Sequence, residues 1–140
     1  MDITTLLDML RSDEGWQASA YQDHLGFWTI GYGFLIDSRK GGALPKEIAE
    51  AWLLYAANVR WGALTKALPW LLDQPEEVQV ALGNMAYQMG VNGVLNFRKM
   101  LAALEAGDRK QAAVEALDST WAQQTPSRAK RIAALIKGDT

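Results

Sequence analysis

The pattern of apolar residues changes twice along this sequence, and that change constrains the fold more than any other feature. Between positions 3 and 14, apolar side chains recur every three or four residues, which predicts an amphipathic helix. Residues 18–37 instead combine aromatic and β-branched side chains with closely spaced glycines, a pattern typical of short strands joined by tight turns. After Pro45 the helical spacing returns. The sequence therefore predicts an α+β fold with a small antiparallel sheet between helices.

Glycine and proline mark where the predicted elements begin and end. Gly15 is expected to stop the first helix, and Gly26 is expected in the turn of the first hairpin. A long helix is expected from Lys46 to about residue 64. Strands are expected near residues 18–23, 27–32 and 34–37, and further helices over residues 76–89, 94–105, 109–119 and 126–137. Leu68-Pro69 is expected to be a break, Gly90 to stop the helix before it, and Asp108 and Thr125 to cap the last two helices.

Composition excludes several classes of function. The 140 residues are 49% hydrophobic, which is enough to bury a core, and contain no cysteine that could form a disulfide or a thiolate metal site. The formal net charge is -2, and basic residues are spread along the chain, so nucleic-acid binding gets little support. We expect no signal peptide, no membrane insertion and no cofactor.

Two carboxylates near the predicted hairpin are candidates for acid–base chemistry. Glu14 falls in the last turn of the first helix, where the helix dipole and the neighbouring Asp13 both act to raise its pKa. A general acid that works near neutral pH needs such a shift. Asp23 enters the hairpin and would be the second carboxylate. Each residue taken alone is more typical of an exposed helix end or a turn, and glycoside hydrolysis requires both together.

Few other side chains offer chemistry. Thr29 is polar within an apolar strand, where its hydroxyl could position water beside Asp23, although threonine also simply favours strands. His24 is the only histidine, so a metal site is not expected. Of the six tryptophans, Trp28 and Trp121 are the better candidates for stacking on sugar rings. Trp52, Trp61 and Trp70 are expected to lie in or near a core.

Three separate segments resemble the phage-type lysozymes, glycoside hydrolase family 24, and most of all their T-even branch. Their order and spacing match that family over almost the whole chain. The segments are residues 13–33, with Asp13-Glu14-Gly15, Tyr21-Gln22-Asp23 and Gly26 to Gly33; residues 84–97, with Asn84 to Gly90, Gly93 and Phe97; and residues 121–131, from Trp121 to Arg131.

The resemblance implies one lysozyme domain over residues 1–140. It would contain a sheet lobe over about 15–45, a connecting helix over about 46–64, and a helical lobe formed by residues 1–14 and about 65–140. The implied activity is hydrolysis of the β-1,4 bond between N-acetylmuramic acid and N-acetylglucosamine in peptidoglycan. No nucleic acid and no metal would be involved.

The resemblance also implies roles for individual residues. Glu14 would be the general acid, with Asp23 and Thr29 completing the catalytic set. Arg128 would lie near Glu14 as a counter-charge, which opposes the upward pKa shift expected above. The implied substrate-binding residues are Leu35 and Tyr87 along the sugar sites, Gln88 and Trp121 meeting near the cleft floor, and Arg128.

This sequence departs from the family pattern at several of these places. Phe34 stands where many members carry histidine. Met100 and Glu115 replace a serine and an asparagine that contact substrate in the T-even branch. Subsite preference and pH dependence are therefore not transferred from the family to this chain.

Two alternative functions remain open at this stage. A lytic transglycosylase needs one acid and no water, and Asp23 argues against it. A wall-binding or virion structural module on the same fold would be expected to lose Glu14, Asp23 or Thr29, and all three are present. On the leading hypothesis the chain is a monomer that waits in the host cytoplasm until a holin releases it to lyse the cell from the periplasm. A tail-associated lysozyme or a prophage-encoded copy is equally compatible with the sequence.

Overall fold

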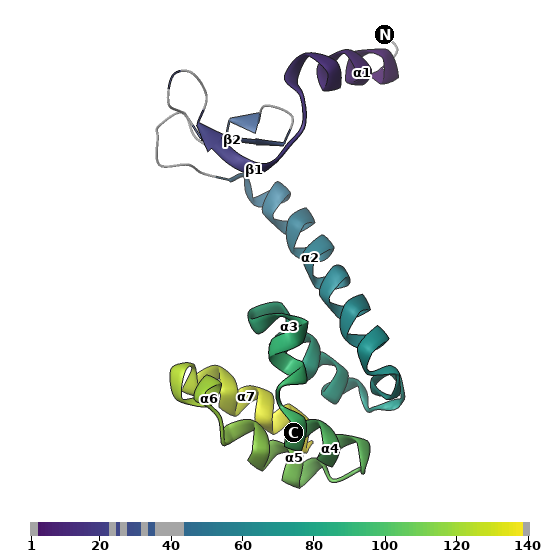
Figure 1. The fold of residues 1–140 in the computed structure, drawn as a ribbon, viewed down its shortest axis with the longest axis vertical. Coiled ribbons are helices and arrows are strands. Elements are labelled where there is room, and N and C mark those ends of the chain that lie inside the picture. The colour runs from purple at the N-terminus through teal and green to yellow at the C-terminus, as the bar shows by residue number, and fades with distance from the viewer. Residues whose placement is uncertain (1–2, 23–24, 26–27, 32–33, 36–43, 139–140) are drawn as a thin grey trace. The chain divides into compact units, whose positions relative to one another are not determined.

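The computed structural model describes residues 3–22, 25, 28–31, 34–35 and 44–138 (Figure 1). Backbone contacts group the chain into two units, Met1–Ala51 and Trp52–Thr140, which we call the sheet unit and the helical unit. Helices together with a three-stranded antiparallel sheet confirm the predicted α+β class.

Helix α1 spans Ile3–Glu14, as the apolar spacing predicted. Gly15 ends it with φ at 69°, and its N–H donates to the carbonyl of Arg11 at 3.1 Å. Glycine suits this position because it has no Cβ to clash in the left-handed conformation. The backbone of Glu14 thus lies in the last turn of α1, where unpaired carbonyl groups carry partial negative charge.

The sheet contains three short strands in sequential order. They are β1 (Gln17–Gln22), β2 (Trp28–Gly31) and β3 (Phe34–Leu35). Thr29 lies on the central strand, paired with Tyr21 on one side and Leu35 on the other. The register shifts between Gln17 and Tyr21, an irregularity of the kind that bends a strand locally. The predicted turn at Gly26 lies outside the described residues.

Helix α2 spans Lys46–Ala67 and continues from the sheet unit into the helical unit. The predicted start at Lys46 is confirmed, and the helix extends about one turn beyond the predicted end. It stops because Pro69 follows. A proline disfavours the helical conformation of the residue before it, and Leu68 accordingly has φ -126° and ψ 73°.

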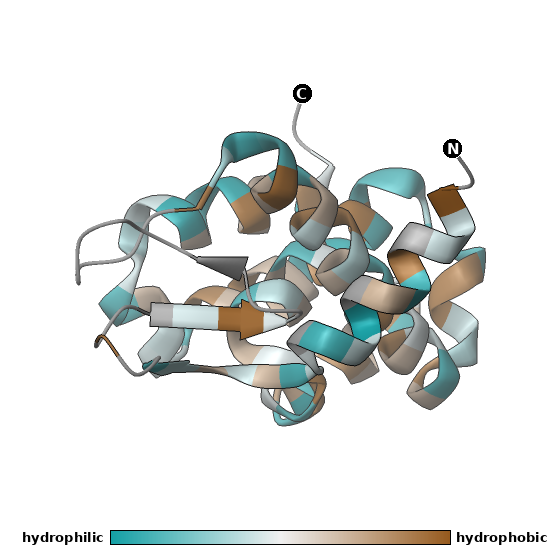
Figure 2. Ribbon diagram, turned by 90° about the horizontal axis from the view of Figure 1, so that it is seen from above, coloured by the Kyte–Doolittle hydropathy of each residue, from teal (hydrophilic) through white to brown (hydrophobic). Residues whose placement is uncertain are grey.

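The rest of the helical unit is a set of packed helices. They are the 3-10 helix η1 (Pro69–Asp73), α3 (Glu76–Leu95), α4 (Arg98–Glu105), α5 (Arg109–Leu117), α6 (Thr120–Gln124) and α7 (Pro126–Lys137). Apolar and polar segments alternate along the helices (Figure 2), as expected when one side of each is buried. The fully buried Leu64, Leu82, Met85 and Leu104 anchor the core, each contributing roughly 1.5–3 kcal/mol by burial.

Several helix boundaries differ from the sequence prediction. Helix α3 continues to Leu95, but Gly90 inside it has φ 80° and ψ 166°, so the predicted break at this glycine is present as a kink. Helix α4 begins at Arg98, four residues later than predicted. Asp108 caps α5 as predicted, its carboxylate accepting from the N–H of Gln111 at 3.1 Å.

The sequence prediction missed helix α6. Its start is defined by Ser119, whose hydroxyl oxygen accepts from the N–H of Ala122 at 3.1 Å. Thr125 occupies the N-cap position of α7 and Pro126 follows it, as predicted, but the Thr125 hydroxyl makes no capping hydrogen bond with that helix. The Thr125 hydroxyl instead donates to the carbonyl of Trp121 at 3.0 Å and so closes the end of α6. In the part of the chain that the structure describes, no helix is both long and apolar enough to cross a membrane.

Candidate functional site

Thr29 is the predicted catalytic residue that the structure describes most fully. Its side chain is 5% exposed, and it is the one buried polar side chain among the described residues. Its central place in the sheet explains the burial, since strands pair with β2 on both edges. A buried hydroxyl is held in place by the groups around it, which is what a water-positioning role requires.

The two predicted carboxylates are described only in part. The backbone of Glu14 lies at the end of α1, and Asp23 lies outside the described residues. Leu35, predicted to line the sugar sites, is described as a backbone position on β3. The catalytic assignment of Glu14 and Asp23 and the binding role of Leu35 stay predictions.

Gln88 and Trp121 meet in the helical unit. The indole N–H of Trp121 donates to the side-chain carbonyl oxygen of Gln88 at 2.9 Å, joining α6 to α3. Trp121 is 9% exposed, so its N–H needs this acceptor. The bond fixes the indole plane, and Phe97 packs edge-on against it with ring centroids 5.9 Å apart.

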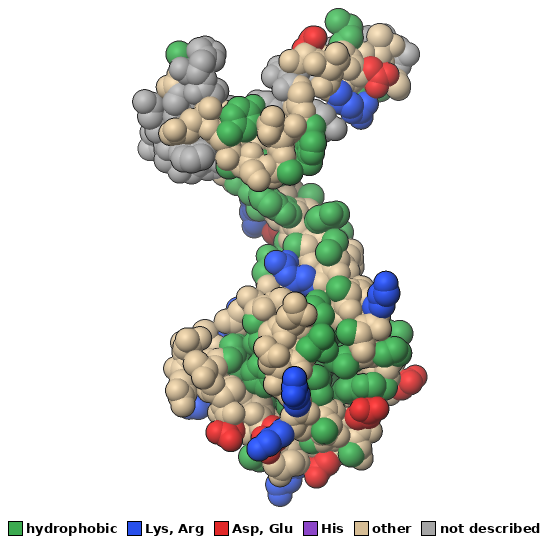
Figure 3. Space-filling view, in the orientation of Figure 1, with side chains coloured by type: hydrophobic (Ala, Val, Ile, Leu, Met, Phe, Trp, Pro, Cys, Tyr) green, Lys and Arg blue, Asp and Glu red, His purple; other side chains and the backbone are tan. Residues whose placement is uncertain are grey.

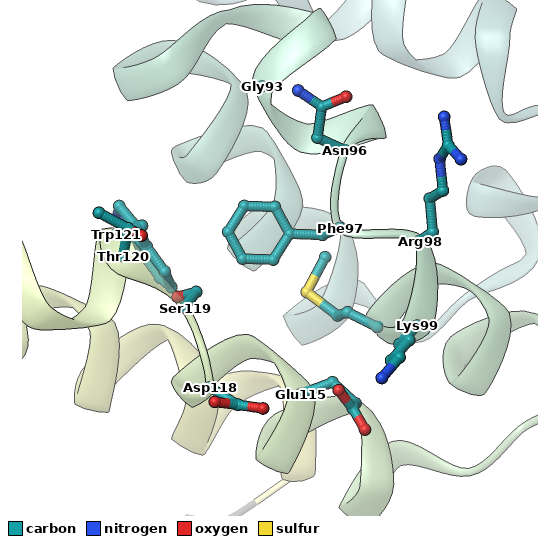
Figure 4. A pocket seen from close by; sticks show the side chains of 11 residues that line it. Gly93, Asn96, Phe97, Arg98, Lys99, Glu115, Asp118, Ser119, Thr120 and Trp121 are labelled. Carbon is teal, nitrogen blue, oxygen red and sulfur yellow. The ribbon is translucent and has the colours of Figure 1, made fainter.

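A groove of about 680 Å³ opens beside this pair of rings (Figure 4). It is formed where α3 meets α4 and where α5 meets α6. Its lining residues are Gly93, Asn96, Phe97, Arg98, Lys99, Met100, Glu115, Asp118, Ser119, Thr120 and Trp121. An aromatic floor with polar groups around it is the usual composition of a site that binds a sugar or a peptide.

Charges of both signs line the groove. Arg98 and Lys99 come from the start of α4, whereas Glu115 and Asp118 come from the end of α5 and the residue after it (Figure 4). Glu115 also accepts a hydrogen bond from the Gln111 amide at 3.0 Å. The groove therefore offers donors and acceptors to a ligand that carries both kinds of charge.

Sequence reasoning found only part of this groove. Trp121 was predicted as a binding residue, and Met100 and Glu115 were noted as departures from the family pattern. Asn96 and Asp118 were missed because they lie at junctions between helices, where polar residues are ordinary. Phe97 belonged to a family motif, but only packing shows that its ring faces Trp121.

Tyr87 and Arg128 do not line this groove. The Tyr87 side chain is 40% exposed, and the Cζ atom of Arg60 lies 5.0 Å from its ring centroid. The Nε of Arg128 donates to the side-chain oxygen of Asn84 at 2.9 Å, which ties α7 to α3. The predicted proximity of Arg128 to Glu14 joins residues of different units and stays a prediction.

The remaining tryptophans divide by position. Trp61 and Trp70 pack partly buried against the core, as predicted, whereas Trp52 is 54% exposed. The indole of Trp61 also lies 3.5 Å from where a Cβ on Gly83 would be, so this glycine lets α2 and α3 approach closely. The side chain of Trp28 lies outside the described part of the chain.

Charged side chains on the visible face of the helical unit are interspersed rather than grouped by sign (Figure 3). Among the residues that the structure describes, no group of three or more histidine, cysteine, aspartate or glutamate side chains could hold a metal ion.

Comparison with known proteins defines the class. The family model described as phage lysozyme matches residues 11–137. That match includes the end of α1, the sheet, and every helix of the helical unit. The chain belongs to the phage lysozyme family.

Individual relatives agree with this class. The chain is 32% identical to the pre-baseplate central spike protein Gp5 of Enterobacteria phage T4, over 94% of this chain and 27% of that protein. It is 29% identical to probable T4-type lysozyme 1 of Dictyostelium discoideum and 27% identical to probable T4-type lysozyme 2, over 99% of this chain and 96% of each relative. The chain thus spans about a quarter of the spike protein but nearly the whole of the two lysozymes. The family supports a glycosidase that acts on peptidoglycan.

Proposed function

We propose that this chain is a muramidase that hydrolyses the β-1,4 bond between N-acetylmuramic acid and N-acetylglucosamine. The observation that carries the proposal is the family match over residues 11–137, because the matched range includes Glu14, Asp23 and Thr29. The hydrogen-bonded Trp121 beside a groove in the helical unit supports it, because an oriented indole suits the apolar face of a sugar ring.

The three residues would have distinct roles. Glu14 would protonate the glycosidic oxygen as the bond breaks. Asp23 would activate a water molecule on the opposite face of the sugar, and the buried Thr29 hydroxyl would position that water. Leu35, Tyr87, Gln88, Trp121 and Arg128 would contact or orient the glycan.

We favour inversion over retention because Thr29 has the character of a water-positioning group. An inverting pair of carboxyl groups lies roughly 6.5–9.5 Å apart, whereas a retaining pair lies about 5–5.5 Å apart. Trapping a covalent sugar adduct on Asp23 would exclude inversion and make Asp23 the nucleophile.

The biological setting follows from the proposed reaction. The chain would act as a monomer on the wall of the host, reaching the periplasm from the cytoplasm when a holin opens the membrane, and would lyse the cell. The two relatives named as T4-type lysozymes support the enzymatic part of this proposal.

The first test is clearance of chloroform-treated Gram-negative cells by the purified protein, followed as a fall in turbidity. The second is mass analysis of the wall fragments released. We expect clearance and fragments with reducing ends. Anhydro-muramic ends would instead indicate a lytic transglycosylase, and wall binding without any cleavage would indicate a structural module.

A further inference from the structure

Arg60 contacts Tyr87, and the roles assigned above make no use of Arg60 or of this contact. Arg60 is on α2 and Tyr87 is on α3, both within the helical unit. The guanidinium carbon lies 5.0 Å from the centre of the Tyr87 ring, a distance at which the cation is attracted to the ring face. Tyr87 adjoins Gln88, which holds Trp121 at the groove.

Arg60 differs from three other arginines of the helical unit in having no described polar partner, and from the fourth, Arg98, in being partly buried rather than exposed. Arg109 donates to Glu77 and to two backbone carbonyls, Arg128 donates to Asn84, and Arg131 donates to Ser127. Arg60 has no hydrogen bond or ion pair with any residue that the structure describes, although its side chain is partly buried. Its N–H groups are therefore open to a ligand that supplies an acceptor.

The chemistry of the guanidinium group indicates which ligand fits. The attraction to the ring uses no hydrogen-bond acceptor, so the N–H groups of the guanidinium stay available, and they form a planar fork that matches a carboxylate. The half-exposed Tyr87 ring provides an apolar surface beside that fork. A neutral sugar offers hydroxyl and amide oxygens, but the carboxylates of peptidoglycan are on its stem peptides.

We propose that Arg60 determines specificity by binding a carboxylate of the peptidoglycan stem peptide, and that Tyr87 holds its guanidinium in place. This inference rests on the proposed function, because it takes peptidoglycan as the substrate. Arg60 touches the substrate away from the reacting bond, so its effect falls on binding rather than on the chemical step.

The test measures binding to isolated wall sacculi by co-sedimentation, in a Glu14→Gln background so that the wall is not digested. Half of the sacculi are treated with carbodiimide and ammonia, which converts stem carboxylates to neutral amides. Arg60→Gln is expected to weaken binding to native sacculi about tenfold, a typical effect for one charge-assisted bidentate contact. On amidated sacculi the variant and the parent protein are expected to bind equally.

Two further variants distinguish recognition of a carboxylate by Arg60 from general electrostatic attraction between the protein and the wall. Lys66→Gln removes the same charge from an exposed position on the same helix, and it is expected to bind both kinds of sacculi as the parent protein does. Arg60→Lys keeps the charge but not the planar fork, and it is expected to fall between the parent and Arg60→Gln. Thermal unfolding of each variant establishes that it is folded under the assay conditions.

The proposal is overturned if Arg60→Gln binds native sacculi normally, or if it loses binding equally on native and amidated sacculi. It is also overturned if Lys66→Gln loses as much as Arg60→Gln. Wall clearance by the otherwise unaltered chain tests the muramidase assignment separately, since carboxylate-dependent binding through Arg60 can persist in a protein that cleaves nothing.

Discussion

The two units of this protein divide stability and proposed chemistry between them. Within the described residues, the buried apolar side chains all lie between Leu64 and Ile136, in the helical unit. In the sheet unit, the buried side chain with a polar group is Thr29, and the predicted acids Glu14 and Asp23 belong to the same unit. The helical unit therefore has both the described core and the groove, whereas the proposed catalytic residues belong to the sheet unit.

This difference has a physical basis. A groove that binds a long glycan needs side chains held in fixed orientations, and packed helices provide them, as the Trp121–Gln88 bond illustrates. A general acid needs a place that disfavours its charged form, and the end of α1 provides one at some cost to the helix. Substitutions in the two units should therefore separate activity from stability.

Glu14→Gln should have the largest effect, on activity alone. Loss of general-acid assistance is expected to slow wall clearance by about 10²–10⁴-fold. Removing a negative charge from the last turn of α1 should leave the free energy of unfolding unchanged or raise it by about 0.3–1 kcal/mol. Turbidity assays and urea titration measure the two quantities. If Glu14→Gln lost activity because it unfolded, the expected separation of activity from stability between the two units would be contradicted.

Leu82→Ala should lower stability and leave the activity of the folded protein unchanged. Leu82 is 0% exposed on α3, and truncation of such a side chain typically lowers the free energy of unfolding by about 2–5 kcal/mol. Activity per folded molecule should be retained. Leu72→Ala is the matched control, because Leu72 is 58% exposed and should change stability by about 0.5 kcal/mol or less. Similar losses for both variants would show that the core is not where the structure places it.

Gln88→Leu should lower both stability and wall binding, because Gln88 accepts the hydrogen bond of Trp121, which is buried in the core and also lines the groove. The Trp121 N–H would lose its acceptor, which is expected to cost about 1–3 kcal/mol of unfolding free energy. The freed indole should also weaken binding to wall sacculi. Gln111→Leu is the control for stability, because it removes only the exposed hydrogen bond between Gln111 and Glu115, which are one turn apart on α5. Normal stability of Gln88→Leu, measured by thermal unfolding, would mean that the bond contributes little.

Arg11→Ala should have the smallest effect. Arg11 and Asp8 form an ion pair at 3.0 Å on α1, but their side chains are 52% and 70% exposed. Exposed pairs of this kind contribute about 0.2–1 kcal/mol, and less at high salt. Urea titration at low and high salt should show a small difference that shrinks as salt is added. A larger loss would mean that Arg11 has a partner outside the described residues.

The sequence predicted most elements because their signals are local. Apolar spacing located α1 and the start of α2, and Gly15, Asp108 and Pro69 marked boundaries through their own backbone chemistry. Helix α6 was missed because five residues are too short for a periodic pattern. The sequence located Thr125 at the start of α7 but not the partner of its hydroxyl, because the same hydroxyl can cap one helix or close the preceding one, and only the three-dimensional structure selects between these.

The candidate site shows the same limit. Gln88 and Trp121 belong to the family motifs and were therefore predicted as binding residues. Packing of the helices brings them within hydrogen-bond distance. No pattern within either helix indicated that Asn96 and Asp118 line one groove, because they are 22 positions apart in sequence and belong to different helix junctions. The pairing of Arg60 with Tyr87 was likewise invisible, since it depends on how α2 packs on α3.

The sequence by itself determined the α+β class, the family, and which residues are candidates for chemistry, because periodicity, glycine positions and motif spacing are properties of the chain alone. The tertiary structure decided that Thr29 is buried, that Trp121 is fixed by Gln88 beside a groove, and that the Arg60 guanidinium lies over the Tyr87 ring. Burial and pairing depend on contacts between segments distant in sequence, and those contacts exist only once the helices and strands have packed.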